Sequence, residues 1–223
     1  MPAFDLSQGS QTLARYDVVG MYSDYLPRFI RHVSLFDGDA ATVSMYEEVK
    51  VAHMGPPLGT GCNLPVHAVG GVSLTNDEIK QIEARIEEMK DEYEAEGPDR
   101  KQQYIIDPPW KDERDPNTGV RRYRRFSCAG FVLDAHLQVD IELLDLDKSV
   151  LPEVDKETLQ LAYADVDVAR KGADLERYGV GGEGPWRIVL AGYVLHALDR
   201  PSELIRREPY QAQSGDELFP AAR

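Results

Sequence analysis

Apolar residues recur at helical spacing between Thr75 and Glu96, where the pattern of hydrophobic and polar positions is clearest. The apolar positions lie three or four residues apart and form one stripe, made of Ile79, Ile82, Ile86, Met89 and Tyr93. Thr75 and Glu78 have capping-box spacing, and Gly97-Pro98 is a stop signal. The pattern predicts a helix over residues 75–96 whose other faces are acidic and solvated.

Three further segments have helical or ambiguous patterns. From Cys128 onward, the apolar positions 132, 135, 139 and 143 share one face and predict a partly buried helix to about Leu144. Another helix is predicted over residues 155–171, between a proline and a glycine. Residues 186–198 (WRIVLAGYVLHAL) are almost wholly apolar, which fits either a buried helix or a buried strand.

Shorter apolar segments alternate with turn signals and predict strands. Residues 66–74 (VHAVGGVSL) are rich in β-branched side chains and predict a strand with a glycine kink. Residues 102–127 predict two strands around a long polar loop, whereas the Gly- and Pro-rich residues 55–65 predict a loop. Together these elements predict a single α+β domain over residues 1–223, with its core at about 40–200 and a peripheral tail at about 208–223.

Composition narrows the class of protein. An apolar fraction of 42% with 29% charged residues is ordinary for a soluble globular chain. The formal net charge of −14 repels phosphate backbones and anionic lipids, so no nucleic-acid partner is expected. We find neither a long apolar run nor a secretory signal pattern, so no membrane span is expected. Only two cysteines occur, Cys62 and Cys128, which favours a reducing compartment and a cytoplasmic location.

Cys128 is the first candidate for chemistry, because it opens a predicted helix directly after an arginine cluster. A helix N-terminus and nearby cations both stabilise a thiolate, the nucleophilic form of cysteine. Strand alternation places Arg122 and Arg124 on one face, so two of the four arginines could approach the thiol. Ala129 and Gly130 leave room for a substrate carbonyl. The alternative is a structural cysteine, since free cysteine is among the most buried residue types.

Two short motifs carry a resemblance. FSCAGFV (126–132) resembles the cysteine motif of the NlpC/P60 superfamily of papain-like thiol hydrolases, and VHAVGGV (66–72) resembles the histidine strand of its circularly permuted members. The resemblance implies a papain-like α+β fold, in which a small antiparallel sheet packs against the cysteine-bearing helix, with additional helices. It also implies Cys128 as nucleophile and His67 as general base. The chain departs from the motif at Ala129, where the superfamily often has serine, and in the long helix that follows the histidine strand.

The resemblance leaves the third, orienting polar residue open between Gln103 and Asp107. Among the other histidines, His136 lies roughly 12 Å along the same helix, too far to act as a base for Cys128. His196 is the second candidate base, because unpermuted members place the histidine after the cysteine. His32 and His53 have no supporting pattern.

Cofactor and metal motifs are missing from the sequence. It contains no HExxH, CxxC or GxSxG, and its glycine-rich loops lack the features of a phosphate cradle. The segment 53–62 could bring His53 and Cys62 together, but two ligands do not make a zinc site. We therefore expect no cofactor and no metal.

Two hypotheses follow. In the first, the protein is a thiol hydrolase or acyltransferase that attacks an amide or ester through a thioester on Cys128, with Arg122 and Arg124 recognising an acidic group of the substrate. In the second, it is a non-enzymatic acidic binding or assembly protein, in which Cys128 is structural and the acidic 77–96 helix is a partner surface. The two differ in whether His67 and Cys128 lie within hydrogen-bonding reach.

Overall fold

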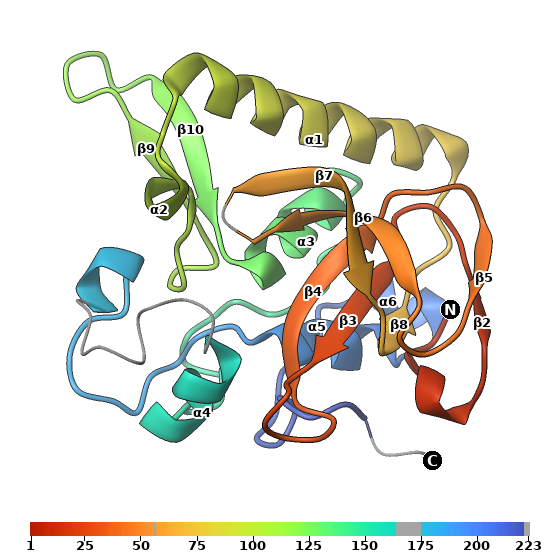
Figure 1. Ribbon diagram of the computed structural model, residues 1–223. Helices are drawn as coiled ribbons and strands as arrows, with labels where there is room; N and C mark the ends of the chain where they lie inside the picture. Colours follow the sequence, from red (N-terminus) through yellow and green to blue (C-terminus); the bar gives the residue numbers. More distant parts are fainter. Residues whose placement is uncertain (56, 164–174, 221–223) are drawn as a thin grey trace.

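A computed structural model describes residues 1–55, 57–163 and 175–220 (Figure 1). Within these residues, the main sheet is antiparallel with six strands in the order β1-β8-β3-β4-β6-β7. Its strands are β1 (Phe4–Asp5), β3 (Val18–Tyr22), β4 (Ile30–Phe36), β6 (Glu48–Met54), β7 (Leu58–Pro65) and β8 (Ala68–Gly70). Two small sheets pair β2 (Gln11–Leu13) with β5 (Ala41–Val43), and β9 (Trp110–Arg114) with β10 (Arg121–Phe126). The architecture is therefore of the α+β class.

Helices complete the fold. They are α1 (Asn76–Glu96), α2 (Arg100–Gln103), α3 (Cys128–Leu137), α4 (Lys156–Ala162), α5 (Ala191–Leu198) and α6 (Ser202–Ile205), with short 3-10 helices η1 (Leu6–Gln8) and η2 (Leu175–Tyr178). Among the helices of the described ranges, none combines the length and the apolar character that a bilayer span needs.

The main sheet separates two hydrophobic clusters, because successive side chains of a strand face opposite sides. Along β3, Val18 belongs to the larger cluster and Val19 to the smaller one. The larger cluster also holds the buried faces of α3 and α5, both of which contact β4. The smaller cluster is completed by Leu13 of β2 and Val43 of β5.

α1 confirms the predicted helix over residues 75–96. The Thr75 side chain accepts a hydrogen bond from the backbone of Glu78, whose carboxylate accepts one from Thr75 in return, so the capping box is present. Gly97 ends the helix with φ 58°, a left-handed conformation that glycine adopts without strain. In Figure 1, α1 runs across β7 and α3 and reaches the β9–β10 hairpin at its C-terminal end.

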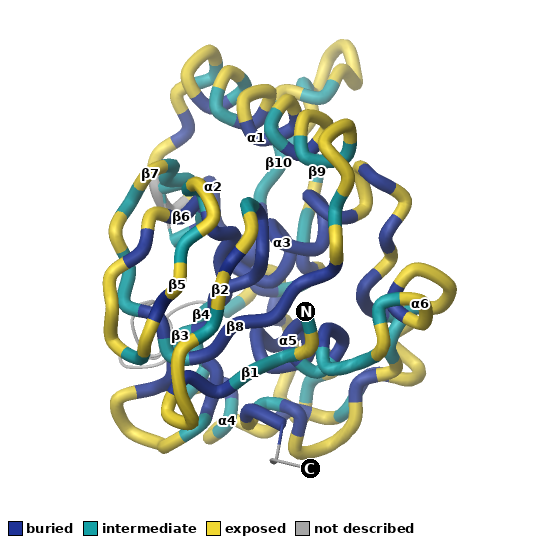
Figure 2. The backbone as a smooth tube through the Cα atoms, turned by 90° about the vertical axis from the view of Figure 1, so that its right-hand side faces the viewer, coloured by how far each residue is buried: buried dark blue, intermediate teal, exposed yellow. Residues whose placement is uncertain are grey.

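α3 begins at Cys128 as predicted but ends at Leu137, before the predicted end near residue 144. Beyond Leu137 the amides of Val139 and Ile141 both donate to the carbonyl of His136, and Asp140 takes φ 57°. This tight turn stops the helix while keeping the following apolar side chains in the core. Cys128 to His136 are all buried, and Figure 2 shows α3 inside the molecule.

Residues 55–65 were predicted to form a loop, and this is wrong. Residues 58–65 are the strand β7, which pairs with β6 over most of its length. Backbone hydrogen bonds to β6 stabilise this strand more than apolar side chains do, so its glycines do not prevent it from forming. The predicted strand over 66–74 is confirmed only for Ala68–Gly70.

The remaining predictions have mixed outcomes. The polar segment 102–127 does contain two strands, β9 and β10, and the apolar segment 186–198 forms a helix, α5. The helix predicted over 155–171 is present as α4, and its predicted part from 164 onward lies outside the described residues.

The C-terminal segment is not a peripheral tail. Ala212, Asp216 and Phe219 are buried, and the backbone of Phe219 donates to Arg28 on the loop before β4. A β-bridge also joins Leu218 to Phe29. The segment therefore belongs to the folded core, which extends beyond the predicted limit near residue 200.

Candidate functional site

Cys128 lies buried at the start of α3, with only 3% of its surface exposed. Burial raises the pKa of its thiol, and the backbone of Val33 and the Tyr104 hydroxyl offset this effect only in part. The sequence predicts the opposite, a pKa lowered by the helix end and the arginines. Desolvation is the larger effect here, so the thiol stays protonated at neutral pH.

The space beside Cys128 is filled by the protein itself. A Cβ atom added at Gly130 would lie 1.8 Å from the carbonyl oxygen of Pro109. The same oxygen accepts a hydrogen bond of 2.9 Å from the backbone of Ser127, the residue that caps α3. Gly130 therefore provides room for the Pro109 carbonyl, and not for the substrate carbonyl expected from the sequence.

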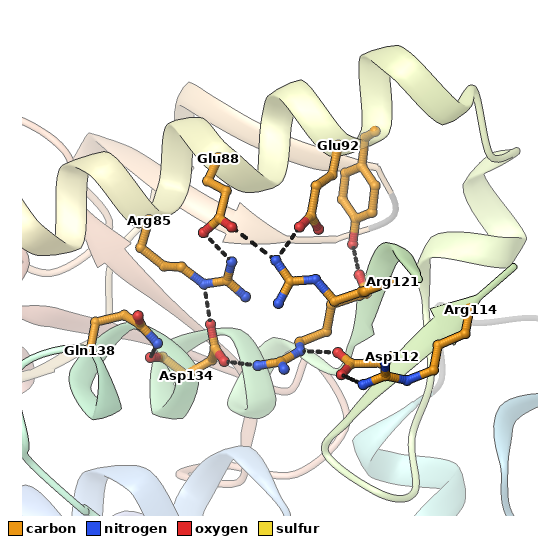
Figure 3. Close-up of polar contacts among 10 residues, drawn as sticks. Arg85, Glu88, Glu92, Asp112, Arg114, Arg121, Asp134 and Gln138 are labelled. Carbon is orange, nitrogen blue, oxygen red and sulfur yellow. Dashed lines mark hydrogen bonds and ion pairs between the residues drawn. The ribbon is translucent and has the colours of Figure 1, made fainter. Parts of the chain in front are cut away.

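The arginine cluster contacts carboxylates of its own chain instead of Cys128. Arg121 pairs with Glu88 and Glu92 of α1, and Arg122 pairs with Glu96. These contacts are drawn in part in Figure 3.

The other two arginines are bound in the same way. Arg124 pairs with Asp112 and Asp134, and Arg125 pairs with Glu113 and donates to the carbonyl of Tyr104. The predicted role of Arg122 and Arg124 in binding a substrate is therefore not supported, because their guanidinium groups are engaged by carboxylates of the same chain.

At the centre of this network, Asp134 on α3 is fully buried. One of its oxygens accepts from Arg85 Nε at 2.9 Å (Figure 3). The other accepts from Arg124 Nη1 at 2.5 Å. Arg85 belongs to α1 and Arg124 to β10, so a single carboxylate joins three elements. We regard the network as a structural clamp that holds α1 and the β9–β10 hairpin on α3.

His67 lies elsewhere, just before β8. Its backbone N–H donates to Gly20 at 3.0 Å, and its ring Nδ1 accepts from the backbone of Tyr22 at 3.4 Å. Within the described residues, no hydrogen bond, ion pair or electrostatic effect links His67 to Cys128. The predicted cysteine–histidine pair is not assembled, because the thiol lies in the core and the imidazole lies among the rings of a surface pocket.

The remaining histidines do not replace His67 as a partner for Cys128. His136 bonds Val132 within α3, and His196 contacts Asp216 and the carbonyl of Leu218 in the C-terminal segment. The ring nitrogens of His32 and His53 lie 3.2 Å apart.

The hairpin of β6 and β7 brings His53 and Cys62 together, as the sequence suggested it could. A Cβ atom added at Gly59 would lie 3.2 Å from His53 Nε2 and 2.6 Å from Cys62 Sγ, so both side chains lie beside this glycine. In the part of the chain that the structure describes, however, no group of three or more potential ligands is placed to hold a metal ion.

The pocket that contains His67 has a volume of about 400 Å³. Its lining includes three rings, two carboxylates and one guanidinium group, from Tyr22, Tyr46, His67, Asp5, Asp24 and Arg28. Tyr22 stacks on His67 with ring centroids 5.4 Å apart, and Tyr46 lies at 86° to His67 with centroids 5.0 Å apart. The rings therefore form two walls that meet at nearly a right angle.

Two polar atoms of this pocket are buried without hydrogen-bond partners in the described residues: the Tyr22 hydroxyl and Arg28 Nε. Burial raises the pKa of Tyr22, and the nearby Asp5 raises it further. Arg28 Nε lies 4.0 Å from an Asp5 oxygen, beyond hydrogen-bonding distance. Both atoms are closed off from solvent and lie near the Asp5 carboxylate, so they form part of the polar wall of the pocket.

A second pocket of about 200 Å³ lies beside the 107–110 segment, where Asp107 and Lys148 form an ion pair. Cys128 lines neither pocket. Because the second pocket has only about half the volume, the pocket around His67 is the stronger candidate site.

Sequence reasoning identified His67 but missed the residues around it. Asp5, Tyr22, Arg28 and Tyr46 come from separate segments: β1, β3, the loop before β4 and the turn before β6. No spacing in the sequence links them, since the sheet order β1-β8-β3 brings them together.

Comparison of the chain with protein-family models, with curated proteins and with solved structures finds no match in any of the three.

Proposed function

We propose that the protein is a non-enzymatic binding protein and that the pocket around His67 is its ligand site. The observation that carries this proposal is a concave site of about 400 Å³ lined by the rings of Tyr22, Tyr46 and His67 together with the charged side chains of Asp5, Asp24 and Arg28. Largely apolar concavities with a few convergent polar groups are typical of small-molecule sites.

The thiol hydrolase or acyltransferase is the weaker hypothesis. It needs an accessible thiolate with a histidine in reach, whereas Cys128 is buried, has a raised pKa and has no contact with His67. The relationship to the permuted papain-like proteins stays a prediction of the sequence, as does the cytoplasmic location.

The acidic helix was the other candidate surface for a partner. Several of its carboxylates are already engaged by the arginines of β10, among them Glu88, Glu92 and Glu96. Much of the charge on this face therefore serves the attachment of α1, which favours the pocket over the helix as the binding site.

Ligand-observed NMR with a library of small cationic, neutral and anionic fragments tests the proposal. We expect hits whose binding is lost in Tyr46→Ala and retained in Tyr25→Ala, a matched control because Tyr25 lies outside the pocket lining and is 64% exposed against 68% for Tyr46. Cys128→Ala should retain the same hits. Fragments that bind Tyr46→Ala as well as the unchanged protein, or a complete lack of hits, would contradict the proposal.

A further inference from the structure

We infer that the pocket around His67 binds an organic cation, namely the alkylated ammonium group of a small molecule. The inference rests on the proposed function, because it names the chemistry of the ligand that the same pocket takes.

The arrangement of the aromatic rings is the first observation that supports a cationic ligand. The face of an aromatic ring attracts a cation held within about 6 Å of its centroid, and several rings at right angles are the usual receptor for quaternary ammonium groups. Tyr46 lies at 86° to His67, so a ligand in this corner meets two differently oriented rings. Tyr46 is 68% exposed and gives the ligand access from solvent.

His67 contributes a neutral ring. Its Nδ1 accepts a hydrogen bond from the backbone of Tyr22, which leaves the proton of the neutral imidazole on Nε2. Burial lowers the pKa of His67, and the charge of Arg31 lowers it further against the opposing effects of Asp24 and Asp5. At neutral pH the ring therefore does not repel a cation.

The charges in the pocket favour a cation over an anion. Asp5 and Asp24 both line it. Asp24 lies 3.6 Å from Arg31 Nη1 but is strongly exposed, and Asp5 lies 4.0 Å from Arg28 Nε. Arg28 is the positive group of the lining, but its Nη2 is bound by the carbonyls of Phe219 and Pro220, at 3.1 Å and 2.5 Å. An anion would have to compete with these carbonyls and approach both carboxylates.

The charge of the whole chain acts in the same direction. A net charge of −14 raises the local concentration of cations around the protein. This contribution is long-range and is weakened by salt, whereas contacts inside the pocket are screened much less. Binding measured at about 0.15 M salt, where the screening length is about 8 Å, separates the pocket from general attraction.

Titration calorimetry with two probes of equal shape tests the inference. Choline is the cationic probe. The neutral control is the alcohol in which a tert-butyl group replaces the trimethylammonium group. We expect choline to bind the unchanged protein about tenfold more tightly than this alcohol does. Choline should bind Tyr46→Ala about tenfold more weakly than the unchanged protein, and Tyr25→Ala with the same affinity as the unchanged protein.

The outcomes separate the two proposals. If the neutral alcohol binds as tightly as choline and Tyr46→Ala abolishes both, the pocket is the ligand site but the inference of a cation is wrong. If choline binds equally to the unchanged protein and to Tyr46→Ala, the cation is attracted elsewhere and the inference is also wrong. If choline does not bind at all while fragments of other charge bind at Tyr46, the proposed function stands without the cation.

Discussion

Arg85 on α1 and Asp134 on α3 form an ion pair of 2.9 Å with both side chains almost completely buried. The second oxygen of Asp134 binds Arg124 of β10, so two guanidinium groups share one carboxylate. Charges removed from water are tolerated only when they are paired, and loss of one partner leaves the other uncompensated. This relationship explains why arginines precede Cys128 without touching it.

Asp134→Asn should destabilise the fold strongly. It removes the charge and keeps the shape, so the buried Arg85 is left with only the half-exposed Glu88 as a counterion, and the free energy of unfolding should fall by up to about 3–5 kcal/mol. Urea denaturation followed by circular dichroism measures this. Arg122→Gln is the control, because it breaks an ion pair near the surface and should change the midpoint little. Equal effects of the two substitutions would refute the clamp.

The two cysteines should differ in reactivity. Cys128 is buried with a raised pKa, whereas Cys62 on β7 is partly exposed. A colorimetric disulfide reagent should therefore modify one thiol in the native protein and the second only on unfolding. Cys62→Ser should remove the first reaction, and Cys128→Ala the second. Rapid native labelling of Cys128 would revive the enzyme hypothesis.

Gly130→Ala should be destabilising because the new methyl group would collide with backbone. The clash involves the carbonyl of Pro109, which is not the flexible end of a side chain. Overpacking of this kind costs typically about 1–3 kcal/mol. Gly181→Ala is a matched control, since nothing lies within 4 Å of the added atom and the backbone there has no positive φ. A thermal midpoint of Gly130→Ala equal to that of the control would show that the site has room.

Acidic pH should weaken the binding of a cation to the pocket. The pKa of His67 lies below its ordinary value, mainly through burial, so the ring is neutral at pH 7 and gains a positive charge only as the pH falls through this lowered pKa. A cationic ligand is then repelled. The other charged groups that act on this ring are Arg31, Asp24 and Asp5.

Choline affinity measured from pH 8 downward should decline on the acidic side in the unchanged protein. The His67→Phe variant keeps an aromatic ring and has no proton to gain, so its affinity should decline less on the acidic side than that of the unchanged protein. An identical pH profile in the two proteins would exclude the imidazole as the titrating group.

Local signals explain which parts of this fold the sequence predicts. α1 carries its own capping box, apolar stripe and terminal glycine within adjacent residues, and its bounds were predicted closely. β7 has no such pattern, because pairing with β6 defines it. The early end of α3 depends on a turn around Asp140, and the burial of Phe219 depends on contacts with Arg28 almost the whole chain away.

The site follows the same rule. Cys128 and the arginines are neighbours in sequence, which suggested an activated thiol, but the partners of Arg121 and Arg124 include Glu92 and Asp134 on other elements. Similarly, His67 was identified from a local motif, whereas its stacking partner Tyr22 is supplied by a strand that only the sheet order places beside it. The sequence identified the chemically interesting side chains, but it did not predict the contacts between elements that set the pKa values of Cys128 and His67.

The imidazole proton resonances of the five histidines provide the most direct test of the central claim, since they sample separate parts of the molecule. During titration with choline at neutral pH, the His67 resonance should shift and saturate, because this ring lines the pocket with Tyr22 and Tyr46. The resonances of His136 in the core and of His196 beside the C-terminal segment should stay in place. A stationary His67 resonance, or shifts spread equally over all five histidines, would contradict the assignment of the pocket as the binding site.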